Sequence, residues 1–128
     1  MQLEHAAVWT HDLERLKQFY VDNFGATPGA RYVNDRRGFT SYFLSFDAGA
    51  RLEIMTIVGL SEGPDRRTPA AGYAHLAFSL GTTARVDSMT ADLRAAGCTI
   101  LSAPRWTGDG YYESVILDPD GNQIELTV

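Results

Sequence analysis

Two histidines and two glutamates recur at matching intervals along this chain of 128 residues. The histidines at 5 and 75 are 75 − 5 = 70 residues apart, and the glutamates at 53 and 125 are 125 − 53 = 72 residues apart. The chain has only three histidines, so chance is a poor explanation of this match. Imidazoles and carboxylates together suit a borderline or hard divalent metal ion, with a position left open for substrate. The predicted metal ligands are His5, Glu53, His75 and Glu125.

Each of these side chains, taken singly, also has an ordinary structural explanation. A lone histidine on a strand is commonly a hydrogen-bonded structural residue. Glu53 shares a predicted strand face with Arg51 and Met55, as an exposed salt-bridge partner would. Glu125 lies in the last predicted strand and can simply point to water. The repeated pattern favours a metal site, whereas His11 has no counterpart in the second half and is predicted to be a surface residue.

The first half of the chain predicts a β-α-β-β-β order of elements. Apolar side chains at spacings of three and four predict one buried helix face, formed by Leu13, Leu16, Tyr20 and Phe24. Asp12 suits the N-cap of this helix, and Gly25 suits its C-terminal end. The predicted strands cover residues 3–9, 30–33, 39–46 and 51–58.

The second half predicts the same order again. A helix begins after Thr82 or Thr83 and ends at Gly97. Its apolar stripe is formed by Val86, Met89, Leu93 and Ala96. The predicted strands cover residues 73–80, 98–101, 111–117 and 123–128. The chain is therefore predicted to be an α+β protein, a single domain of residues 1–128 with modules 1–58 and 73–128 joined by a Gly- and Pro-rich linker at 59–72.

Composition narrows the class of protein. With 45% apolar residues the chain can form a packed core. Its formal charge is −5, and the sequence lacks the basic patch that binding to nucleic acid requires. No stretch approaches the roughly 20 apolar residues of a membrane span, and the start of the sequence does not look like a secretory signal. The single Cys98 cannot form an internal disulfide and is predicted to be a small buried thiol. The sequence predicts a cytoplasmic protein that binds neither membrane nor nucleic acid.

Three segments of the sequence resemble the vicinal-oxygen-chelate superfamily, which includes glyoxalases, bleomycin resistance proteins and extradiol dioxygenases. They are "EHAAVWTHDLERLKQFYVDNFGA" at the first histidine, "YAHLAFSL" at the second, and "LDPDGNQIEL" at the last glutamate. The resemblance covers essentially the whole chain. It implies two tandem βαβββ modules that form a curved mixed sheet around one divalent metal ion (Zn, Ni, Co, Mn or Fe). It also implies a homodimer.

The four-ligand set is similar to that of glyoxalase I, in which a glutamate moves a proton between adjacent carbons while the metal stabilises an enediolate. The resemblance therefore implies a metal-dependent lyase or isomerase that acts on a small substrate with vicinal oxygens. Glu125 is the implied catalytic base, Glu53 stands opposite it, and either suits the role. Two alternatives remain open. One is a non-catalytic drug- or metabolite-binding protein, and the other is a small iron-dependent extradiol-type dioxygenase, which needs only three of the ligands.

The sequence departs from the glyoxalase I pattern where glutathione would bind. Relatives usually place an arginine four residues after the first histidine and an asparagine four residues after the first glutamate. Here Trp9 and Ile57 occupy those positions, and neither can form a charge-assisted bond to a carboxylate. Trp9 is instead predicted to form an apolar or aromatic wall for the substrate, although a core role fits it equally well. Arg105 and Tyr111 are further candidates for binding an anionic substrate.

Overall fold

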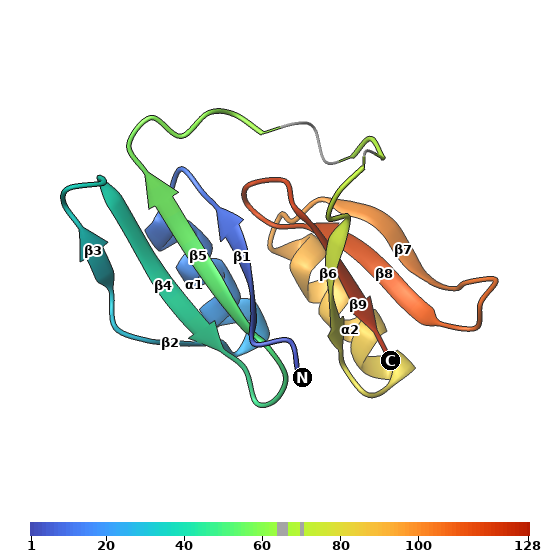
Figure 1. Ribbon diagram of the computed structural model, residues 1–128. Coiled ribbons are helices and arrows are strands. Elements are labelled where there is room, and N and C mark those ends of the chain that lie inside the picture. Colours follow the sequence, from blue (N-terminus) through green and yellow to red (C-terminus); the bar gives the residue numbers. More distant parts are fainter. Residues whose placement is uncertain (64–66, 70) are drawn as a thin grey trace. The chain divides into compact units, whose positions relative to one another are not determined.

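The computed structural model describes residues 1–63, 67–69 and 71–128 of the chain. These residues form two compact units, Met1–Gly63 and Pro64–Val128, each a mixed sheet with one helix (Figure 1). The predicted α+β fold built from repeated βαβββ modules is confirmed. The predicted linker at 59–72 includes residues 64–66 and 70, which lie outside the described residues. In the part of the chain that is described, no helix has the length and apolar character needed to cross a membrane.

The first unit contains a five-stranded sheet with α1 across one face (Figure 1). Its strand order is β1-β5-β4-β2, and β3 also pairs with β4. The β1 and β5 strands are parallel, and the other pairs are antiparallel. The elements are β1 (His5–Trp9), α1 (Leu13–Phe24), β2 (Thr27–Pro28), β3 (Tyr32–Asn34), β4 (Phe39–Ser45) and β5 (Arg51–Ile57).

The second unit repeats this plan with a four-stranded sheet in the order β6-β9-β8-β7. The first and last strands of the unit, β6 and β9, are again parallel neighbours, and α2 lies across one face of the sheet (Figure 1). The elements are β6 (His75–Ser79), α2 (Thr83–Ala95), β7 (Ile100–Trp106), β8 (Tyr112–Leu117) and β9 (Gln123–Thr127).

Both helices begin at predicted caps. The Asp12 side chain accepts a hydrogen bond from the Arg15 backbone N–H, and Thr82 accepts one from Arg85 in the same way. The α1 helix ends at Gly25, whose φ of 64° is the left-handed conformation that glycine adopts without strain. Local sequence alone therefore determines where these helices start.

The buried face of each helix differs from the predicted stripe. In α1, Phe19 is buried and Phe24 is only half-buried, since Phe24 lies at the last turn. In α2, Met89 is only half-buried, Ala96 is exposed and Thr90 is buried. Thr90 tolerates burial because its hydroxyl bonds the Val86 carbonyl at 2.6 Å and the Ser114 hydroxyl on β8 at 2.7 Å.

Further sequence predictions differ in detail from the structure. The strand predicted at 98–101 is β7, which covers Ile100–Trp106. The strand predicted at 30–33 is two short edge strands, β2 and β3, on either side of an exposed segment at 29–31. A proline in β2 is tolerated because this strand lies at the sheet edge. Cys98 is half-buried rather than fully buried, and burial still raises the pKa of its thiol.

A tight turn joins β8 to β9 and is organised by one buried carboxylate. Asp118 accepts hydrogen bonds from the backbone N–H groups of Asp120 at 2.9 Å and Asn122 at 2.8 Å, and from the Asn122 amide at 2.9 Å. Its own N–H donates to the Asn122 carbonyl. The turn thereby sets the start of β9, the strand that carries Glu125.

Replacing Asp118 with alanine is expected to lower the free energy of unfolding by about 2 kcal/mol, because it leaves three part-buried N–H donors without their charged acceptor. Urea unfolding followed by circular dichroism measures this. Asp47→Ala is the matched control, since Asp47 is an exposed aspartate in the corresponding turn of the first unit. Equal unfolding free energies for the two variants would contradict the role assigned to Asp118.

Candidate functional site

Strand register places the first predicted pair of ligands on one face of its sheet. In the parallel β1–β5 pair, His5 lies opposite Arg51 and Ala7 lies opposite Glu53. His5 and Glu53 therefore project from the same face, one diagonal step apart. The alternate residues of β5, Leu52 and Ile54, are buried on the helix-covered face.

The second unit repeats this register. In the parallel β6–β9 pair, His75 lies opposite Gln123 and Ala77 lies opposite Glu125. The alternate residues Ile124 and Leu126 are buried. Each unit thus presents a histidine and a glutamate, in the same diagonal relation, on the face of its sheet that carries no helix.

In the first unit, the His5 ring is held by its neighbours. Its Nδ1 atom hydrogen-bonds to the Glu4 carboxylate, which also forms an ion pair with Arg51. The edge of the imidazole packs against Phe43, with ring centres 5.2 Å apart. Glu53 is half-buried on the same face, opposite Phe43 across the β4–β5 pair.

In the second unit, the two predicted ligands contact each other directly. His75 Nε2 lies 3.4 Å from Glu125 Oε2, and the Glu125 side chain is only 16% exposed. Burial raises the pKa of the Glu125 carboxyl. Repulsion by Glu113, a hydrogen bond to that residue and the charge of Asp109 raise this pKa further, while His75 lowers it. The Glu125 carboxyl is therefore protonated more readily than an ordinary glutamate.

Glu113 is a candidate site residue that sequence reasoning missed. It lies on β8, two residues before Val115, which faces Glu125 in the β8–β9 pair. Alternation along "YYESVIL" does put a carboxylate on an otherwise apolar strand face, and this was the available signal. Only the pairing of β8 with β9 shows that the carboxylate reaches Glu125.

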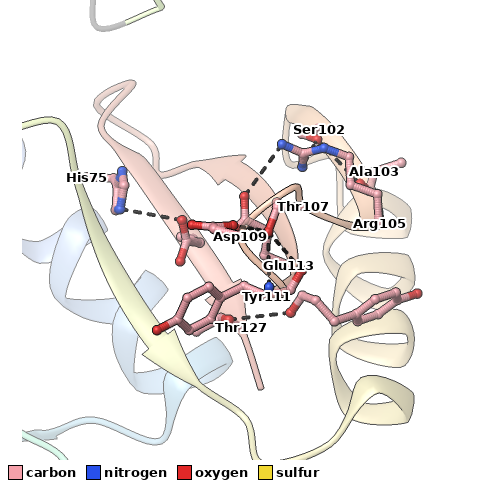
Figure 2. A network of polar contacts seen from close by, with 11 residues as sticks. His75, Ser102, Ala103, Arg105, Thr107, Asp109, Tyr111, Glu113 and Thr127 are labelled. Carbon is pink, nitrogen blue, oxygen red and sulfur yellow. Dashed lines mark hydrogen bonds and ion pairs between the residues drawn. The ribbon is translucent and has the colours of Figure 1, made fainter.

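Arg105 joins the same cluster from β7. Its guanidinium lies 3.5 Å from Glu113 Oε1 and donates a hydrogen bond to the Ser102 hydroxyl at 2.5 Å (Figure 2). The Arg105 side chain remains half-exposed. The arginine predicted from sequence thus belongs to a network that continues through Glu113 to Glu125.

Tyr111 lies in the turn between β7 and β8. This turn is closed by Thr107, whose hydroxyl accepts a hydrogen bond from the Tyr111 N–H at 3.1 Å and donates to its carbonyl at 3.0 Å (Figure 2). The Tyr111 side chain is 56% exposed. Its backbone is therefore fixed while its ring is accessible to solvent.

Trp9 lies four residues along β1 from His5 and so projects from the same face. It is 45% exposed and packs edge-on against Phe39, with ring centres 6.1 Å apart. The Phe39 ring also contacts Tyr32, and the Arg37 guanidinium lies 5.9 Å from its centre. Ile57 lies opposite Phe39 on β5. This end of the face is aromatic and apolar.

In each unit, the two predicted ligands thus lie on one face of the sheet, and those of the second unit, His75 and Glu125, contact each other. Among the residues it describes, no group of three or more His, Cys, Asp or Glu side chains forms a ready metal cluster. His11 is half-exposed, lies two residues beyond the end of β1 and is 3.4 Å from Glu62. The donor types nevertheless suit a divalent ion, since each pair offers an imidazole nitrogen and a carboxylate.

A sequence model of the Glyoxalase/Bleomycin resistance protein/Dioxygenase superfamily matches residues 2–126. The chain therefore belongs to this superfamily, as its three motifs predicted. Two bacterial relatives match nearly its full length. The uncharacterized protein PA2024 of Pseudomonas aeruginosa is 30% identical over 127 residues, covering 98% of this chain and 86% of the relative. YwkD of Bacillus subtilis is 27% identical over 128 residues, covering 97% and 94%.

Solved structures show the same fold. Glyoxalase I from Zea mays superposes with a TM-score of 0.81 at 22% identity, covering 98% of this chain and 44% of the maize chain. The chain therefore spans less than half the length of that protein. The trypanothione-dependent glyoxalase I of Leishmania major superposes with a TM-score of 0.77 at 22% identity, covering 99% of this chain and 86% of the other.

Proposed function

We propose that this protein is a metal-dependent enzyme of the glyoxalase type, a lyase or isomerase acting on a small substrate with two neighbouring oxygen atoms. The observation that carries the proposal is the repeated register of the two units. Both place a histidine and a glutamate in the same diagonal relation on the helix-free face of a mixed sheet. On this proposal the two units act as one domain.

The residues that would hold the metal are His5, Glu53, His75 and Glu125. Strands hold such ligands rigidly, and two nitrogens with two oxygens suit Zn, Ni, Co, Mn or Fe. A divalent ion in this position supplies Lewis acidity, which polarises the substrate oxygens and stabilises the negative charge left when a proton is removed.

The protein's own residues would then move the proton. Glu125 takes it from one carbon and returns it to the next, and Glu53 is the candidate for the opposite side of the substrate. Glu113 and His75 hold the Glu125 carboxylate from two sides. These contacts limit the Glu125 side chain to few orientations. Proton transfer between adjacent carbons requires a base that is oriented in this way.

Three residues are proposed to contact substrate. Trp9 offers a half-exposed aromatic surface on the His5 face, where it packs against Phe39. Arg105 offers a half-exposed guanidinium within the Glu113 network, suited to an anionic group. Tyr111 offers an exposed phenol on a turn closed by Thr107.

The aromatic end of the first unit also favours a second candidate function. Trp9, Phe39 and Tyr32 form a contiguous surface of the kind that binds an apolar metabolite or drug without any metal. A non-catalytic binding protein of the bleomycin-resistance type would use this surface and would leave the histidines without a catalytic role.

Metal content distinguishes the two functions. The protein is purified without chelator from cells grown with each of several divalent metals, and its metal is measured by elemental analysis. About one equivalent of metal per chain supports the enzyme. The metal-loaded protein is then assayed with small 2-oxoaldehyde adducts and other vicinal-oxygen substrates. Near-zero occupancy under every supplement contradicts the enzyme and favours the binding protein.

We also propose that the protein forms a homodimer. Each unit has a sheet with one helix-covered face and one face without a helix, and such surfaces are usually covered by another module or another copy of the chain. Light scattering across a wide concentration range is expected to give twice the mass of the chain. A monomer mass throughout would contradict the dimer.

A further inference from the structure

A single carboxylate connects His5 to Arg51 in the first unit. One oxygen of Glu4 bonds His5 Nδ1, and the other bonds the Arg51 guanidinium. The backbone supports the same arrangement, because the Arg51 N–H donates to the Glu4 carbonyl at 3.0 Å. Glu4 is therefore attached to β5 at two points while it contacts the imidazole on β1.

Phe43 completes this arrangement. The Arg51 guanidinium lies 4.2 Å from the centre of the Phe43 ring, and the His5 ring packs edge-on against the same phenyl group. The aromatic ring thus restricts both partners of Glu4. The imidazole has one nitrogen bonded to Glu4 and one side against Phe43, which leaves Nε2 as the atom available to a ligand.

The chemistry of this contact selects one form of the histidine. An ionised carboxylate can only accept hydrogen bonds, so the neutral imidazole must carry its hydrogen on Nδ1. The lone pair then lies on Nε2, which is the form that binds a metal. A carboxylate on the far nitrogen also makes the imidazole a stronger electron donor.

The second unit has different residues at the positions that correspond to Glu4 and Arg51. Ala74 precedes His75, where Glu4 precedes His5. Gln123 lies opposite His75, where Arg51 lies opposite His5. The Nε2 atom of His75 faces the Glu125 carboxylate directly. The two histidines of the repeated pattern therefore differ in what orients them.

We propose that Glu4 is a positioning residue that fixes the tautomer and orientation of His5 for metal binding, with Arg51 fixing Glu4 in turn. This inference rests on the proposed metal-dependent function. It assigns no contact between Glu4 and the metal. Removing Glu4 is expected to weaken metal binding while leaving the fold intact, because exposed ion pairs contribute little to stability.

The first measurement is metal affinity, with Co²⁺ and Zn²⁺ titrated against a competing chelator. Glu4→Ala is expected to weaken binding by roughly 10- to 100-fold, the usual effect of losing such a partner. Glu4→Gln is expected to weaken it less, since the amide oxygen still accepts from Nδ1 while the charge is lost. Glu62→Ala is the matched control, because Glu62 contacts His11 at 3.4 Å and no predicted ligand.

The second measurement is the tautomer of His5 in the metal-free protein, from nitrogen chemical shifts at about pH 8.5, where ordinary histidines are neutral. Glu4→Ala is expected to reduce the Nδ1–H form of His5 and to leave His75 unchanged. An unchanged His5 tautomer, or an affinity loss no greater than that of Glu62→Ala, contradicts the positioning role alone. Absence of metal binding by the unmutated protein contradicts the proposed function itself.

Discussion

Replacing His75 with alanine is expected to lower the affinity of the protein for a divalent metal by more than about a hundredfold. Losing a residue that only hydrogen-bonds to a metal ligand already lowers metal affinity by roughly 10- to 100-fold, so losing the ligand itself lowers the affinity further. Glu125→Gln is expected to have a similar effect, because a neutral amide is a far weaker ligand than a carboxylate for such ions. The two variants should match if the predicted ligands act as one set.

The measurement is elemental analysis of purified variants, followed by metal titration with a chelator. His11→Ala is the control, since His11 is a surface histidine paired with Glu62 and lies outside the predicted set. A loss of metal in His11→Ala equal to that in His75→Ala would show that metal binds nonspecifically to histidine. Retention of metal by His75→Ala, with loss in Glu125→Gln, would show that the site lacks this imidazole.

The methylglyoxal–glutathione hemithioacetal is expected to be a poor substrate even when the metal site is filled. Trp9 and Ile57 occupy the positions where the resemblance to glyoxalase I implies an arginine and an asparagine. Losing one charge-assisted contact costs on the order of 2 kcal/mol, roughly thirtyfold in binding. The surroundings of Trp9 reinforce the expectation, because Phe39 packs against it and Ile57 lies opposite Phe39.

Steady-state kinetics on the metal-loaded protein measures this effect. Trp9→Arg is expected to raise kcat/KM for the hemithioacetal, and Trp9→Phe is the control that removes the indole without adding charge. A kcat/KM near the ~10⁶ M⁻¹s⁻¹ of an efficient enzyme in the unmutated protein would contradict the prediction. It would mean that other residues bind glutathione.

The sequence by itself determined the repeated fold. Helix starts follow from local chemistry, because Asp12 and Thr82 each bond a backbone N–H only three residues away. Alternation along the strand placed Glu53 on the face shared with Arg51 and Met55, opposite the buried leucine and isoleucine of β5. The duplication predicted that His75 and Glu125 occupy positions equivalent to those of His5 and Glu53, and the strand registers of the two units agree.

Contacts between strands far apart in sequence were decided only by tertiary structure. Register shifts in the β7–β8 pair place Arg105 opposite Glu113, whereas an unbroken register from the Ile100–Ile116 pair would place it opposite Tyr111. Irregularities of this kind have no dependable sequence signal, since they depend on how two whole strands fit together. The proximity of Glu113 to Glu125 follows from the pairing of β8 with β9, and Glu113 adds to the effect of burial, which is the main cause of the raised pKa of Glu125.

The hydrogen bond between Glu4 and His5 depends on both the local sequence and the tertiary structure. Sequence placed the two residues side by side, but adjacent side chains on an extended strand normally point to opposite faces. Glu4 lies just before β1, and Arg51 on β5 holds both its backbone carbonyl and its carboxylate, so that the carboxylate contacts the His5 ring. Alternation thus predicts which face a strand residue occupies, while the partner that orients it depends on side chains brought in by another strand.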